Sequence, residues 1–125
     1  AYASAALHAA PSEPSVPIVH AGFSQGGQMA FRAAVRSGGA AGIVSVGADV
    51  PPELLADASL RFPAVLLVRG DEDPWYTAAK FDADVAALRA RGARVDPVVS
   101  RGGHEWTSAV SDAVAQWLET IVLHA

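Results

Sequence analysis

Three short segments of the chain carry residue types that together can perform nucleophilic catalysis. Ser24 stands between glycines in "GFSQG" at 22–26, directly after an apolar run. Carboxylates crowd into "RGDEDP" at 69–74, and His104 follows two glycines in "GGHEW" at 102–106. A serine hydroxyl is a weak nucleophile until an imidazole accepts its proton, and the imidazole needs a carboxylate to fix its tautomer and stabilise its cation.

The "GFSQG" segment has the G-x-S-x-G pattern of a nucleophile elbow. In that motif the serine occupies a sharp, strained turn between a strand and a helix. The flanking glycines, Gly22 and Gly26, allow the strand and the helix to approach each other. The structural alternative is a glycine-rich turn in which Ser24 merely caps the following helix.

Strands and helices alternate along the whole chain, which predicts an α/β fold. Short apolar runs bounded by glycine or proline predict the strands, and apolar residues at helical spacing predict the helices. Val110, Val114, Trp117, Leu118 and Ile121 are expected to be core residues of the last helix. The expected strands are 17–22, 42–48, 63–70 and 94–99; the expected helices are 25–37, one turn within 50–60, 77–91 and 105–123.

Such alternation predicts a parallel sheet of about four strands flanked by helices, in a single domain that spans residues 1–125. Pro97 cannot donate to a strand ladder and therefore predicts that strand 94–99 lies at a sheet edge. Ligands of such sheets bind beyond the carboxyl ends of the strands. Ser24, the carboxylates and His104 follow three of these ends, and we expect a gap of roughly 10 Å between the serine and acid loops, because neighbouring strands lie about 4.8 Å apart.

The segments "GFSQGG", "RGDEDP" and "GGHEW" resemble the phospholipase/carboxylesterase branch of the α/β-hydrolases, which includes the acyl-protein thioesterases. The order serine, acid, histidine is the order of that fold. In this family a G-x-x-D-P segment supplies the catalytic acid, which implies Asp73 and leaves Asp71 and Glu72 as solvated loop charges. The resemblance covers about residues 15–123 and implies that Ser24, His104 and Asp73 hydrolyse a carboxylic ester or thioester through an acyl-enzyme, without a cofactor.

The resemblance also assigns supporting roles around the serine. The residue after the nucleophile, Gln25, would donate one backbone N–H to the oxyanion, and we expect Phe23 and Trp75 to contact the substrate. Two positions depart from the family: Arg69 stands where relatives often carry histidine, and "WY" at 75–76 stands where they usually carry small apolar residues.

The family has further strands upstream of the nucleophile, and one upstream loop gives the second oxyanion donor. We expect this chain to lack those N-terminal strands, because "LHAA" at 7–10 is too near Ser24 to be that loop. Two functions follow as alternatives: a serine esterase, and a non-catalytic fragment or binding module that lacks half of the oxyanion hole. We further expect strand 17–22 to pair through its open edge, with a second copy or with a separate N-terminal segment.

Composition excludes several other classes of protein. The formal net charge of −4 argues against nucleic acid as the partner, and the absence of cysteine excludes thiol nucleophiles and disulfides. No apolar run is long enough to cross a membrane, and we expect a cytoplasmic protein. No metal site is expected, because the histidines lack ligand spacing; His20 is expected to be a core residue, and His8 and His124 to have no role.

Overall fold

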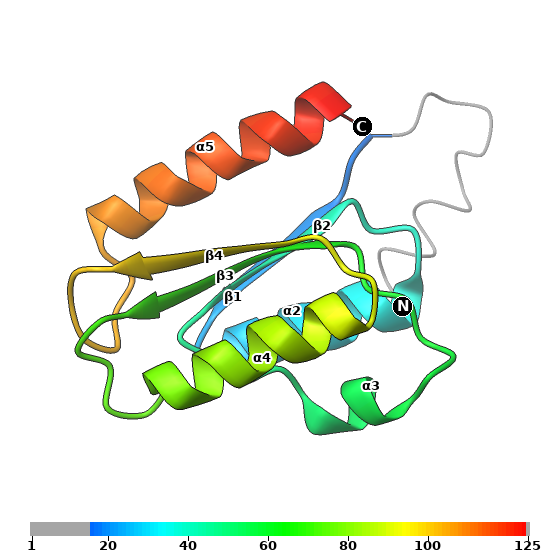
Figure 1. The fold of residues 1–125 in the computed structure, drawn as a ribbon. Helices are drawn as coiled ribbons and strands as arrows, with labels where there is room; N and C mark the ends of the chain where they lie inside the picture. The colour runs from blue at the N-terminus through cyan, green and yellow to red at the C-terminus, as the bar shows by residue number, and fades with distance from the viewer. Residues whose placement is uncertain (1–15, 125) are drawn as a thin grey trace.

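The computed structural model describes residues 16–124 and contains one four-stranded parallel sheet in the order β1-β2-β3-β4 (Figure 1). Strands and helices alternate as the sequence predicts. The strands are β1 (Val19–Phe23), β2 (Gly42–Val46), β3 (Ala64–Gly70) and β4 (Val95–Ser100); the helices are α2 (Gln25–Ser37), α3 (Pro52–Ala56), α4 (Ala78–Ala90) and α5 (Ser108–His124).

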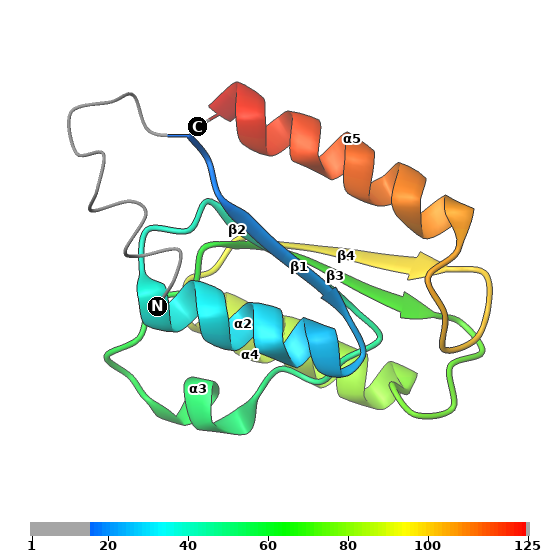
Figure 2. The ribbon, with the colours of Figure 1, turned by 180° about the vertical axis from the view of Figure 1, so that it is seen from behind.

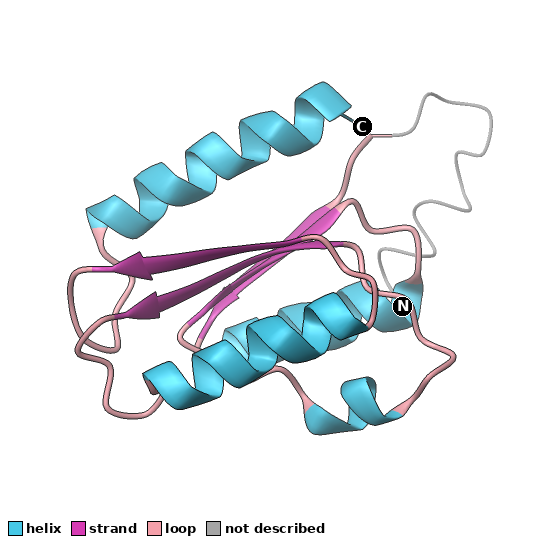
Figure 3. Ribbon diagram, viewed as in Figure 1, coloured by secondary structure: helices cyan, strands magenta, loops and turns pink. Residues whose placement is uncertain are grey.

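The helices cover the two faces of the sheet unequally (Figures 2 and 3). Helices α2 and α4 lie on one face, and α5 lies alone on the other. Each face has its own buried apolar cluster, and the cluster beneath α5 includes Val110, Val114, Trp117 and Ile121, as expected of core residues. Because parallel strands bury both faces, β2 and most of β3 are completely buried, in keeping with their largely apolar sequences.

The two edge strands differ from this pattern. Strand β4 alternates between more and less buried positions, and its Pro97 lies opposite Leu67 of β3 at one sheet edge, which confirms the expected placement. Strand β1 forms the opposite edge and pairs only with β2 among the described residues. It begins two residues later than expected and ends at Phe23, which continues the strand up to Ser24 itself.

Local sequence signals set the helix ends. Thr77 accepts a hydrogen bond from the backbone N–H of Lys80 and caps α4, and Gly38, with φ 72°, ends α2. The last helix begins at Ser108 rather than at Glu105, because residues 101–107 form the loop that carries His104. Within residues 16–124, no helix is both long and apolar enough to span a membrane.

Candidate active site

Ser24 occupies the turn between β1 and α2 in a backbone conformation that side chains rarely adopt. Its φ is 57°, and it is the one non-glycine residue with positive φ in the described part of the chain. The Ser24 N–H donates to the carbonyl of Val46 at 2.8 Å, which ties the turn to β2. A Cβ atom at Gly22 would overlap the carbonyl of Gly26, so this approach of strand and helix requires glycine. The strain is of the kind that concentrates at functional sites.

His104 reaches Ser24 from the loop after β4. Its Nε2 lies 2.9 Å from Ser24 Oγ, and its Nδ1 lies 2.8 Å from Oδ2 of Asp73. An ionised carboxylate only accepts hydrogen bonds, so the imidazole proton belongs on Nδ1, and Nε2 can accept from the serine hydroxyl. The structure therefore joins the three residues predicted from sequence in one hydrogen-bonded chain.

Asp73 is held ionised and in place by the turn that follows it. Its Oδ1 accepts hydrogen bonds from the backbone N–H groups of Trp75 and Tyr76, at 2.9 and 3.0 Å. Burial, the largest influence, raises the pKa of this carboxyl, but the hydrogen bonds from His104, Tyr76 and Trp75 together outweigh it and leave the pKa lowered. The carboxylate that faces His104 is therefore charged at neutral pH.

The two neighbouring carboxylates are exposed, as expected, and neither contacts His104. Asp71 nevertheless has a structural contact: its Oδ1 accepts from the backbone N–H of Gly102 at 2.9 Å. This bond connects the loop after β3 to the loop after β4. The same loops touch at Gly70, where a Cβ atom would overlap the carbonyl of Gly103. Their close contact sets the position of His104 relative to Asp73.

A buried arginine, Arg69, stabilises the loop at residues 71–76 that carries Asp73. Arg69 is 8% exposed, and its guanidinium donates to the carbonyls of Tyr76 and Asp71, at 3.2 and 3.4 Å. Tyr76 is also fixed through its hydroxyl, which donates to Asp84 Oδ2 at 2.7 Å. Arg69 thus holds the backbone on both sides of Asp73.

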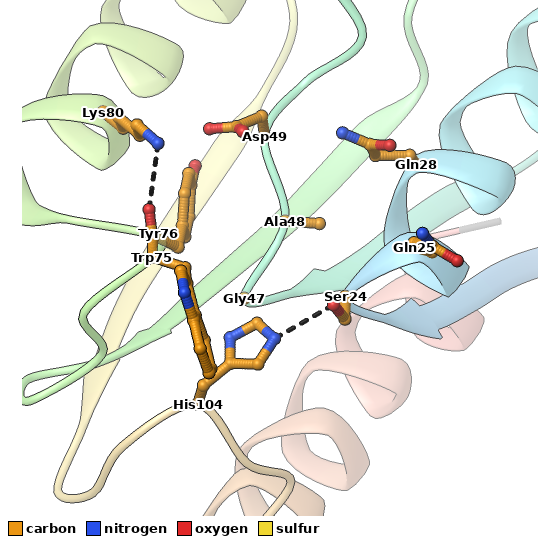
Figure 4. A pocket seen from close by; sticks show the side chains of 10 residues that line it. All are labelled: Ser24, Gln25, Gln28, Gly47, Ala48, Asp49, Trp75, Tyr76, Lys80 and His104. Atoms are coloured by element: carbon orange, nitrogen blue, oxygen red, sulfur yellow. Dashed lines mark hydrogen bonds between the residues drawn. The ribbon is translucent and has the colours of Figure 1, made fainter.

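The imidazole of His104 packs against two aromatic rings, those of Phe23 and Trp75. Their ring centroids are 4.8 and 4.9 Å from that of His104. Beside this group is a cavity of about 370 Å³ whose lining includes Ser24, Gln25, Trp75 and His104 (Figure 4). Trp75 is 66% exposed and lines the cavity, whereas Phe23 packs against the imidazole and is not part of the lining.

The backbone N–H of Gln25 has no hydrogen-bond acceptor among the described residues. Gln25 is the first residue of α2, so its N–H is one of the helix N-terminal donors that lack an intrahelical acceptor. It borders the same cavity as the Ser24 hydroxyl. The Gln25 N–H is therefore free to donate a hydrogen bond to a negatively charged oxygen that forms next to Ser24 Oγ.

Sequence reasoning overlooked the loop after β2, which borders the cavity with Gly47, Ala48 and Asp49. Gly47 has φ 67°, and a Cβ atom there would lie 3.2 Å from the His104 ring and 3.4 Å from Asp73 Oδ2. The imidazole and the Asp73 carboxylate thus leave little space for a side chain at this position. Gly47 follows an apolar run and could have indicated that the strand ends there and a loop begins. We expected the strand to continue to residue 48 instead.

One histidine prediction is wrong, and another falls outside the described part of the chain. His20 is half-buried on edge strand β1, and its imidazole has no hydrogen-bond partner among the described residues, so it is not a satisfied core histidine. His8 and the "LHAA" segment lie outside the described residues. No group of three potential ligand side chains suited to a metal ion occurs within residues 16–124.

Comparison with known proteins identifies the fold. No protein-family model and no curated protein matches the sequence. Among solved structures, esterase PE8 matches with a TM-score of 0.77 and 26% identity over 94% of this chain and 56% of that chain. SOBER1 of Arabidopsis thaliana matches with a TM-score of 0.76 and 17% identity, over 97% and 61%. Acyl-protein thioesterase 2 of Zea mays gives 0.69 and 20%, over 96% and 63%.

These similarities confirm the fold class and, at the level of fold, the resemblance to the phospholipase/carboxylesterase α/β-hydrolases. The described sheet consists of four strands and does not include the further upstream strands of that fold. The chain spans 56–63% of the length of the three solved structures.

Proposed function

We propose that the chain is the catalytic part of a serine hydrolase that cleaves carboxylic esters or thioesters through an acyl-enzyme on Ser24. One observation carries the proposal: the hydrogen-bonded series Ser24 Oγ, His104 and Asp73 opens into a cavity. The three residues come from three separate loops. The names of two similar structures, an esterase and an acyl-protein thioesterase, support the same reaction class.

In the proposed mechanism His104 acts first as a base and then as an acid. Nε2 takes the Ser24 proton as Oγ attacks the ester carbonyl, and the same proton then passes to the departing alcohol or thiol. Asp73 keeps the other imidazole proton on Nδ1 and stabilises the imidazolium. Water repeats the sequence on the acyl-enzyme, which releases the acid and restores Ser24.

The Gln25 N–H is the proposed donor to the tetrahedral oxyanion. Loss of one of two such donors typically costs about 100- to 1,000-fold in rate. A chain in which the Gln25 N–H is the only donor would therefore hydrolyse activated esters slowly. The competing function, a binding module without catalysis, predicts no turnover at all.

Turnover of p-nitrophenyl acetate by the purified chain tests the proposal, with Ser24→Ala as the matched variant. We expect hydrolysis above the Ser24→Ala background by at least about a hundredfold, because the variant lacks the nucleophile. Equal rates for the two proteins would favour the binding module. Thermal melts of both proteins check that the substitution leaves the fold intact.

The free edge of β1 motivates a second proposal, that this strand pairs with another strand in the working protein. On the paired side, the carbonyl of Ile18 accepts from the Ala41 N–H, but the other side of β1 has no neighbouring strand among the described residues. The expected partner is a second copy or a separate N-terminal segment. Sedimentation at micromolar concentration tests this: self-association supports the second copy, and a compact monomer with full esterase activity contradicts both.

A further inference from the structure

The cavity beside Ser24 has two chemically different ends (Figure 4). Ser24 and His104 lie at one end. Gln28, Asp49 and Lys80 lie on the side away from His104 and take no part in the proposed mechanism. A pocket that accepted only an alkyl chain would have no need of an amide, a carboxylate and an ammonium group there.

Among the described residues, Asp49 is the charged group at this end that lacks a partner. Its carboxylate makes no hydrogen bond and no ion pair with any described residue, although the side chain is only partly exposed. It also lies close to a second carboxyl group. Burial is the main reason why the pKa values of Tyr76 and Asp84 are raised, and the charge of Asp49 raises both further. Two carboxyl groups, Asp49 and Asp84, thus act on the region around Tyr76, where Arg69 and Lys80 are the nearby cations.

Lys80 lies at the same end of the cavity, but its ammonium group is held by another contact. Its side chain is exposed, and Nζ donates to the carbonyl of Trp75 at 3.0 Å, which holds the ammonium group at the side of the cavity. It forms no ion pair with Asp49. Exposed charges are screened by water and salt more strongly than partly buried ones. Asp49 thus has no hydrogen-bond donor among the described residues, and it lines the cavity that a substrate would fill.

We propose, on the basis of the proposed function, that Asp49 makes the enzyme select esters whose far end carries a hydrogen-bond-donating polar group, above all a primary ammonium. An ionised carboxylate is only an acceptor, and an alkyl end would remove its water without replacing the lost hydrogen bonds. A primary ammonium restores them as charge-assisted bonds. The side-chain amide of Gln28, on the same side of the cavity, offers the polar end of a substrate both a donor and an acceptor.

Two substrate series test the inference. The first compares p-nitrophenyl hexanoate with its 6-hydroxy and 6-amino derivatives, so that the polar group is on the acyl side. The second compares hexyl acetate with 6-hydroxyhexyl and 6-aminohexyl acetate, so that it is on the alcohol side. We expect kcat/KM of the amino ester to exceed that of the alkyl ester about tenfold in one of the two series, with the hydroxy ester between them.

Asp49→Asn removes the charge with little change of shape, and its amino-to-alkyl ratio should fall to within about twofold of one. Asp82→Asn is the matched control, because Asp82 is an exposed carboxylate on α4 outside the cavity lining. It should keep the wild-type ratio. Rates of Ser24→Ala with each ester give the uncatalysed background to subtract.

The possible results separate the inference from the function on which it rests. Hydrolysis of the alkyl esters with no amino preference in either series would overturn the inference alone. Retention of the full preference in Asp49→Asn would also overturn the inference alone. Failure of the wild-type chain to hydrolyse any of the six esters above the Ser24→Ala background would overturn the proposed function, and the inference with it.

Discussion

Nδ1 of His104 lies 2.8 Å from Oδ2 of Asp73, and no comparable bond joins His104 to Asp71 or Glu72. If this contact fixes the imidazole, Asp73→Asn should lower kcat/KM by at least about a hundredfold, because an amide can present its N–H₂ to Nδ1 and stabilise the wrong tautomer. Asp71→Asn should change kcat/KM less than about threefold, since the amide oxygen can still accept from Gly102. The assignment of the acid is wrong if Asp71→Asn is the damaging change.

The pH profile follows from the charge states of the same pair. The rate should rise with pH, because only a neutral imidazole can accept the proton of Ser24. The lowered pKa of Asp73 means that its carboxylate stays ionised over the pH range of the measurement, so a loss of activity toward acid should not come from protonation of Asp73. Initial rates between pH 5 and 8 measure this. A flat profile would argue against a histidine base.

Asp73 should also make folding sensitive to acid. Its pKa in the folded state is lowered, so its contribution to stability is present above the pKa of the unfolded chain and is lost as the pH falls through the folded value. The wild type should therefore lose more stability than Asp73→Asn does when the pH is lowered below about 4. Urea unfolding at pH 7 and at acidic pH compares the two. An equal loss in both proteins would show that Asp73 is not the group involved.

Gly47 and Gly92 form a matched pair for testing the contact with the imidazole. Both have positive φ, 67° and 81°, but only Gly47 has His104 within reach of an added Cβ; at Gly92 no atom lies within 4 Å. Alanine at either position should cost about 1–2 kcal/mol of stability through backbone strain. Only Gly47→Ala should also lower kcat/KM, by about tenfold or more, because it displaces the ring. Equal activity of the two variants would contradict this.

Trp75 should act on substrate binding rather than on stability. Its indole is 66% exposed and lines the cavity, so Trp75→Ala should change the free energy of unfolding by less than about 0.5 kcal/mol. We expect KM for p-nitrophenyl esters to rise severalfold, with a smaller change in kcat. Trp106→Ala is the control, since Trp106 is exposed and bonded to Ser111 outside the lining. A KM equal to that of the wild type would remove Trp75 from the substrate site.

Sequence patterns predicted the strand ends that carry Ser24, Asp73 and His104, because a parallel sheet gathers its carboxyl ends at one edge whatever the details of packing. They did not predict Gly47, because its role depends on contact with the His104 ring, which comes from the loop after β4, two strands away. The prediction that His20 is a core residue was wrong for a related reason. The burial of a residue on an edge strand depends on which elements lie beside that strand, and hydrophobic periodicity does not indicate this. Asp49 was equally hidden, since a lone carboxylate after a strand is ordinary until a cavity is seen in front of it.

Reaction with a fluorophosphonate, followed by peptide mass spectrometry, tests the proposed nucleophile most directly, because such probes form a stable adduct only with an activated serine. We expect one adduct, on the peptide that contains Ser24, absent from Ser24→Ala and formed at least about a hundredfold more slowly in His104→Ala. Labelling of Ser24 at the same rate in wild type and His104→Ala, or no labelling of the folded wild-type chain, would contradict the activation of Ser24 by His104.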